Sequence, residues 1–124
     1  MTSAHAAISL IARILLAVIF IQSGWGKISG YAETAGYMQS HGVPGVLLPA
    51  VIALELGGGL AILLGIYARW AGLGLALFTL AAAVMFHYVP GDRGQMINFM
   101  KNVTMAGGLL LLFANGPGRW AIKD

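Results

Sequence analysis

The sequence has no cysteine and very little charge. Only 9% of its 124 residues are charged, with four acidic side chains against seven lysines and arginines. Without cysteine, this sequence holds no disulfide, no thiolate nucleophile and no thiolate-held zinc or iron–sulfur centre. A soluble domain of this length carries about a quarter charged residues. The net charge of +3 forms no basic run, so nucleic acid is not an expected partner.

Apolar segments take the place of the missing charge, since 59% of the residues are hydrophobic. Four segments, at residues 6–24, 46–67, 69–88 and 97–114, each approach the ~20 residues that cross a hydrocarbon core. The sequence therefore predicts an all-α membrane protein with one domain over residues 1–124. We expect a four-helix transmembrane bundle of up-down-up-down topology, with the lipid bilayer as its main partner.

The predicted connections differ in length. Residues 24–45 form a long amphipathic loop, in which residues 32–41 are expected to make a short interfacial helix. A very tight turn is expected at residues 68–69, and Pro90 and Gly91 interrupt the third connection. Residues 115–118, Asn-Gly-Pro-Gly, are expected to stop the last helix.

Basic residues give a weak signal for orientation. Four spans place both termini and the 68–69 turn on one side of the membrane, together with Arg69, Arg119 and Lys123. The opposite loops hold Lys27 and Arg93. The positive-inside rule then favours cytoplasmic termini.

Small residues recur at every fourth position of two predicted helices. One stripe holds Ala53, Gly57, Ala61 and Gly65, and the other holds Ala68, Gly72 and Ala76. Such stripes allow close helix contacts, within the bundle or between copies in a homo-oligomer. Gly58 and Gly59 lie on the helix face of Glu55, so we expect them to leave open space beside its carboxylate.

Ionisable residues inside the predicted spans give the main functional signal. Glu55 lies in the middle of the second span, Arg13 inside the first, Lys101 one turn into the last, and His87 at the end of the third. A charge in hydrocarbon costs at least ~2.5–3.5 kcal/mol, so such residues usually face a bundle interior. We expect Arg13 to pair with Glu55. The simpler interpretation is a structural ion pair, with Lys101 extending its ammonium to the interface.

These four helices are expected to build a buried polar pocket. Arg13 and Lys101 would bind the polar head of an anion or a quinone, Glu55 would orient Arg13 and exchange protons, and His87 would relay them. Glu55 and His87 are therefore the catalytic candidates. The expected hydrogen-bond partners are Asn98, Asn102, Gln22 and Tyr88. Methionine and histidine can bind Cu(I), but methionine is also common packing in apolar helices, so no metal site is predicted.

The order of these residues resembles the DoxX family of small bacterial four-helix membrane proteins, over nearly the whole chain. The matching pieces are Arg13…Phe20…Gly24-Trp25-Gly26-Lys27, Gly42-Val43-Pro44, Glu55-Leu56-Gly57-Gly58-Gly59, His87, Lys101-Asn102 and Gly116-Pro117-Gly118. The resemblance implies a location in the bacterial cytoplasmic (inner) membrane. It also implies that Arg13, Glu55, His87, Lys101 and Asn102 occupy the family's polar positions, with Lys27 at the membrane edge.

The resemblance further implies a membrane component of an oxidoreductase system. Relatives include the membrane subunit of thiosulfate:quinone oxidoreductase and proteins that respond to quinones or catechols. We therefore expect a quinone, or a small anionic, sulfur or phenolic substrate, in the buried pocket. The sequence has no haem, flavin or iron–sulfur motif, so electron transfer would need a bound quinone or a soluble or membrane oxidoreductase partner.

Two other functions remain open from the sequence. The chain could be a non-catalytic membrane scaffold for a soluble redox partner, which would bind its long loop or its opposite turn and tail. It could also be a small-molecule or proton-coupled transporter. Small multidrug exporters have a similar length and an embedded glutamate, but theirs lies unpaired in the first helix, where this chain has Arg13.

Overall fold

The computed structural model describes residues 2–124, and four of its helical stretches are long and apolar enough to cross a membrane. The elements are α1 (Ser3–Ser29), α2 (Tyr31–Ser40), η1 (Gly45–Leu47), α3 (Leu48–Ile52), η2 (Ala53–Gly57), α4 (Gly58–Leu64), α5 (Ala68–Ala82), η3 (Ala83–His87) and α6 (Arg93–Asn115). The second span is the continuous stretch from η1 to α4, and the third is α5 with η3. The predicted all-α, four-helix architecture is confirmed.

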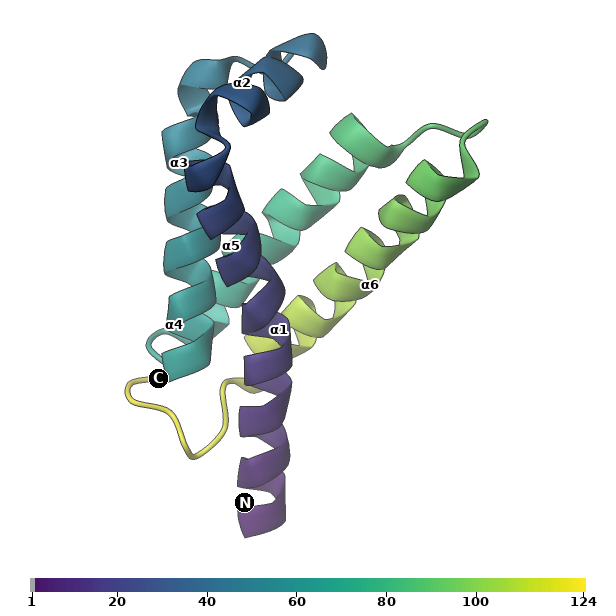
Figure 1. The fold of residues 1–124 in the computed structure, drawn as a ribbon. Helices are drawn as coiled ribbons and strands as arrows, with labels where there is room; N and C mark the ends of the chain where they lie inside the picture. The colour runs from purple at the N-terminus through teal and green to yellow at the C-terminus, as the bar shows by residue number, and fades with distance from the viewer. Residues whose placement is uncertain (1) are drawn as a thin grey trace.

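The chain runs up, down, up and down, so both termini lie at one end of the bundle, the terminal end (Figure 1). The helix α2 and the connection between η3 and α6 lie at the other, the loop end (Figure 1). The short helix expected at residues 32–41 is confirmed as α2. The last helix stops at Asn115 as expected, with Gly116 at a positive φ of 81°.

Two helices are longer than the sequence predicted. The first continues five residues past Gly24, through Lys27, and ends only before Gly30. The last begins at Arg93 rather than at residue 97, because the Asp92 side chain accepts a hydrogen bond from the Gln95 backbone N–H at 3.1 Å and caps the helix. Both extensions lie at the loop end, so they add polar residues to the bundle there.

The turn between the second and third spans lies earlier than expected. It occupies Gly65 to Tyr67, and α5 already begins at Ala68. Gly65 and Tyr67 both have positive φ, 73° and 47°, which reverses the chain within three residues. The apolar Ile66 and Tyr67 made this turn look like helix in the sequence.

The helices associate mainly as two pairs. The first span packs along the second, α5 packs along α6, and the second span joins the pairs through α5, whereas α1 and α6 meet only briefly. Figure 1 shows α5 and α6 leaning away from α1 and α3 towards the loop end. The bundle is therefore tight at the terminal end and wider at the loop end.

Glycines bring α1 and the second span into close contact. A Cβ atom at Gly24 would lie 3.0 Å from the backbone nitrogen of Leu56, and one at Gly59 would lie 2.9 Å from Ile21. Gly58 lies equally close to α5. The expected open space beside Glu55 is therefore wrong on this side, because neighbouring helices fill it.

The two stripes of small residues have different surroundings. Ala68, Gly72 and Ala76 are buried, and a Cβ at Gly72 would lie 3.2 Å from the Leu109 carbonyl oxygen of α6. Gly57 in the other stripe is exposed, and a Cβ added there would meet no atom within 4 Å. Close packing of α5 against α6 therefore uses the second stripe, whereas the first stripe is exposed at Gly57.

Arg13 is buried at the terminal end, and within residues 2–124 its hydrogen bonds all go to backbone carbonyls. Its guanidinium donates to the carbonyl oxygens of Ile62 (3.0 Å), Leu63 (3.1 Å), Pro117 (2.9 Å) and Trp120 (2.8 Å). The first two belong to the last turn of α4, where carbonyls lack helical partners and a cation is favoured. The expected pairing of Arg13 with Glu55 is therefore wrong.

The C-terminal segment folds back onto the turn that Arg13 supports. The backbone N–H of Lys123 donates to the Gly65 carbonyl at 2.9 Å, and that of Tyr67 donates to the Lys123 carbonyl at 2.7 Å. A Cβ at Gly65 would lie 2.6 Å from that of Ala121, so only glycine fits there. Arg13 and this segment together close the terminal end.

We predict that Arg13→Met lowers the free energy of unfolding by about 3 kcal/mol or more, because four buried or part-buried hydrogen bonds from a charged donor are lost. Equilibrium unfolding in detergent micelles measures the change. Arg93→Met, which removes an exposed arginine at the start of α6, is the matched control and should change stability little. Equal effects of the two substitutions would contradict the structural role of Arg13.

Candidate ligand-binding pocket

A cavity of about 490 Å³ lies between the two helix pairs, towards the loop end. Its volume falls within the range of small-molecule sites, about 300–1,000 Å³. The apolar lining consists of Ile19, Phe20, Tyr37, Met38, Val43, Leu47, Val51, Phe78, Ala81, Ala82, Met85, Phe86 and Met105. The polar lining consists of Ser23, Lys27, Thr34, Glu55, Thr79, His87 and Asn102.

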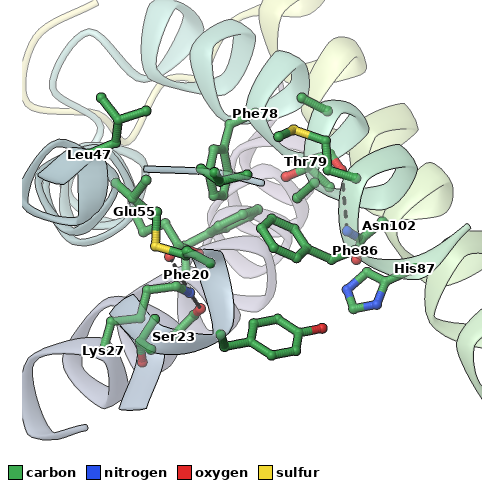
Figure 2. A pocket seen from close by; sticks show the side chains of 18 of the residues that line it. Phe20, Ser23, Lys27, Leu47, Glu55, Phe78, Thr79, Phe86, His87 and Asn102 are labelled. Carbon is green, nitrogen blue, oxygen red and sulfur yellow. Dashed lines mark hydrogen bonds and ion pairs between the residues drawn. The ribbon is translucent and has the colours of Figure 1, made fainter. Parts of the chain in front are cut away.

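Three polar residues on one wall form the ion-pair cluster: Ser23, Lys27 and Glu55 (Figure 2). The Lys27 Nζ atom lies 2.6 Å from Glu55 Oε1 and donates to Ser23 Oγ at 2.7 Å. The Glu55 side chain is 4% exposed and that of Lys27 is 25% exposed. Glu55 thus depends on Lys27 for its counter-charge, whereas Lys27 retains access to the surroundings.

The antiparallel register of α1 and the second span explains this pairing. Arg13 contacts Ile62, and Gly24 contacts Leu56. Later residues of α1 therefore lie beside earlier residues of the second span. Glu55 lies seven residues before Ile62, which is about 10 Å along a helix axis. Arg13 therefore lies too far along the bundle to pair with it, and Lys27, three residues after Gly24, takes that place.

A second polar group lies on the opposite wall and is called here the histidine cluster: Thr79, His87, Gln95 and Asn102. Figure 2 shows Thr79, His87 and Asn102 across the cavity from Lys27 and Glu55. The Asn102 amide donates to the Thr79 carbonyl at 3.2 Å, and His87 Nδ1 lies 2.8 Å from Gln95 Oε1. These bonds join η3 and α5 to α6.

The hydroxyl of Thr79 has no hydrogen-bond partner among residues 2–124, although Thr79 is only 2% exposed. A helical threonine usually satisfies its hydroxyl with the carbonyl four residues earlier. Glu55 Oε1 is also buried, and the Lys27 ammonium at 2.6 Å satisfies it. Among the described residues that line the cavity, the Thr79 hydroxyl is therefore the buried polar group without a partner.

Each cluster includes a residue on a π-helical turn. Glu55 lies in η2, which interrupts the second membrane span, and His87 lies in η3, which ends the third. Such turns are rare and occur often at functional sites, because the extra residue redirects side chains relative to the regular helix. Both turns border the cavity.

Aromatic rings line the cavity between the two clusters and cover its loop end. The rings of Phe20, Phe78 and Phe86 lie between the two polar walls in Figure 2. Tyr37 of α2 stacks on Phe86, with ring centroids 5.4 Å apart, and His41 lies 5.1 Å from the same ring. The short helix α2 thus lies over the cavity and contacts η3 through its aromatic side chains.

The structure brings together only part of the predicted site. Glu55, His87 and Asn102 line the cavity. Lys101 is exposed on the outer face of α6, because one residue along a helix turns the side chain by about 100° from Asn102. Asn98 is exposed and bonds to Gln95, and Gln22 and Tyr88 are exposed as well. Arg13 belongs to the terminal end.

The sequence interpretation missed Lys27 as the partner of Glu55, and it missed Ser23, Thr79 and Gln95. The signal for Lys27 was present, since the buried positions of α1 include Arg13, Ala17, Phe20 and Gly24 at alternating spacings of four and three. The next position in that series is Lys27. Ending the predicted helix at Gly24 concealed it.

We predict that Lys27→Met destabilises the protein more than Glu55→Gln does. The first change leaves a buried carboxylate without its counter-charge and should cost about 3 kcal/mol, whereas the second leaves a lysine that can reach water. The double variant should be less destabilised than the sum of the two, by at least about 1 kcal/mol in the free energy of unfolding.

The matched control is the cycle of Arg13→Met with Glu55→Gln, whose effects should add to within about 0.5 kcal/mol, because the two residues share no partner. Coupling between Arg13 and Glu55, with none between Lys27 and Glu55, would contradict the described ion pair.

Comparison with known proteins identifies the family. The DoxX family model matches residues 8–88. The inner membrane protein YqjF of Escherichia coli is 52% identical over 113 residues, covering 91% of this chain and 87% of that protein. The inner membrane protein YphA of the same organism is 40% identical over 123 residues, covering 94% and 88%.

A more distant relative carries a functional name. CatD of Bacillus subtilis, named as a candidate oxidoreductase, is 29% identical over 76 residues, covering 61% of this chain and 57% of that protein. No solved structure matches the chain. The predicted family and inner-membrane location are confirmed: with four membrane spans and these relatives, the chain is a multi-pass inner membrane protein and belongs to the DoxX family.

Proposed function

We propose that this protein is the membrane component of an oxidoreductase system and binds a quinone or a related phenolic molecule in the cavity between its helix pairs. The supporting observation is that Thr79 lines the cavity and that its buried hydroxyl has no hydrogen-bond partner among the described residues. A buried polar group without a partner costs about 1–3 kcal/mol. A ligand oxygen that bonds to this hydroxyl would recover that cost.

The lining of the cavity suits an aromatic ring with oxygen substituents. Phenylalanine rings from α1, α5 and η3 line the cavity and offer faces and edges to a flat aromatic ring. The two polar clusters lie on opposite walls (Figure 2), so oxygens at the two ends of such a ring would each meet polar side chains. Most of the remaining lining is aliphatic or thioether, which suits an apolar ligand that enters from the bilayer.

The clusters would have different tasks. Lys27 would stabilise negative charge on a ligand oxygen, while Glu55 holds its ammonium in place and exchanges protons. His87, half-buried at the loop end of η3, would connect the cavity to the aqueous side. Electrons would come from a soluble or membrane partner, and the name of the relative CatD supports an assignment to redox chemistry.

We predict that Thr79→Val weakens the binding of 1,4-naphthoquinone about tenfold, because one hydrogen bond to the ligand is lost. The free energy of unfolding should stay the same or rise by about 1 kcal/mol, because the substitution removes a buried hydroxyl that has no partner. Titration of the purified protein in nanodiscs measures binding, with empty nanodiscs as the background, and unfolding in micelles measures stability.

Thr104→Val is the matched control, since this threonine is exposed on α6 and bonds to the Met100 carbonyl. It should leave binding unchanged. If the wild-type protein binds no more naphthoquinone than the empty nanodiscs, or if Thr79→Val binds it as well as the wild type, the proposal is wrong.

A further inference from the structure

We propose that the pocket discriminates between the two redox forms of its ligand and binds the hydroxyl-bearing form, a hydroquinone or phenol, more tightly than the carbonyl-bearing quinone. This inference rests on the proposed function, because it concerns the same pocket. It follows from the direction of the hydrogen bonds in the histidine cluster.

Gln95 fixes the tautomer of His87. Gln95 Oε1 lies 2.8 Å from His87 Nδ1 and also accepts a hydrogen bond from the Asn98 amide at 3.4 Å. A carbonyl oxygen only accepts, so His87 Nδ1 carries the proton and donates it to Gln95. In a neutral imidazole, the other nitrogen, Nε2, then has a lone pair and no proton.

The imidazole of His87 belongs to the cavity lining (Figure 2). Gln95 holds the Nδ1 edge towards α6, and we infer that the opposite edge, with Nε2, faces the cavity. Among residues 2–124, no group hydrogen-bonds to Nε2. A ligand carbonyl brought to this wall would place a second acceptor against it, whereas a ligand hydroxyl would donate to it.

Thr79 does not offset this difference between the two redox forms. Its hydroxyl has no partner among the described residues and can donate to an oxygen of either form. A ligand hydroxyl would therefore satisfy His87 Nε2, whereas a quinone carbonyl would leave this acceptor without a partner.

The test compares 1,4-naphthohydroquinone with 1,4-naphthoquinone under anaerobic conditions, using the full chain in nanodiscs. We expect the hydroquinone to bind about tenfold more tightly or better, as one further hydrogen bond provides. His87→Phe should abolish the preference by weakening hydroquinone binding alone. His5→Phe, at an exposed residue of the terminal end, should keep the preference.

A second variant changes His87 Nε2 from a hydrogen-bond acceptor to a donor. Gln95→Lys places a donor beside Nδ1, so that Nε2 carries the proton, and the preference should shift towards the quinone. Gly94→Lys adds the same charge at the neighbouring exposed position and should leave the preference as in the wild type.

The outcomes separate this inference from the proposed function. Equal binding of the two forms, or tighter binding of the quinone by the wild type, would overturn the redox preference and leave the ligand pocket intact. Absence of binding for both forms would overturn the proposed function, and the preference with it.

Discussion

The ion pair between Lys27 and Glu55 is the interaction on which the rest of the pocket depends. A carboxylate in the middle of a membrane span needs a partner, and the structure supplies it from the last turns of α1. Those turns reach Glu55 only because glycines let α1 and the second span approach closely. The same contact orients Glu55 on its π-helical turn at the wall of the cavity.

Arg13 is also a buried charge, but backbone carbonyls satisfy it instead of an oppositely charged side chain. The two ends of the bundle therefore hold their buried charges in different ways. The Arg13 guanidinium satisfies carbonyls of α4 and of the C-terminal segment, so it stabilises the terminal end without a carboxylate. Glu55 therefore stays with Lys27 at the loop side. Figure 1 shows α5 and α6 leaning away from α1 towards the loop end. Residues of these helices and of α1 line the cavity.

The sequence was sufficient for the architecture and for part of the site. Apolar runs of bilayer length predicted four spans and their topology, and Glu55, His87 and Asn102 do line the cavity. The depth of each charged residue in the membrane did not predict which charges pair. The pairs depend on the register of the antiparallel helices and on which helix face carries each side chain. Lys27 was missed for a local reason: the predicted span ended at residue 24, whereas the helix continues to Ser29.

Other parts of the site depend on burial and side-chain direction, which the sequence alone does not reveal. Thr79 is ordinary in an apolar helix, and only its burial without a hydrogen-bond partner among residues 2–124 makes it a candidate ligand contact. Lys101 and Asn102 are neighbours in the sequence but lie on different faces of α6, so only one of them reaches the cavity. The π-helical turns at Glu55 and His87 likewise change the facing that a regular helix would give.

The central claim, that a quinone or phenolic ligand occupies this cavity, is tested most directly by photoaffinity labelling with an azido-naphthoquinone and identification of the labelled peptides. The account predicts labels on cavity-lining residues such as Met38 and Phe86, and competition by unlabelled ligand. Labels confined to the exposed outer face of α6, around Ile97 and Met100, would show partition into the lipid and would contradict the account.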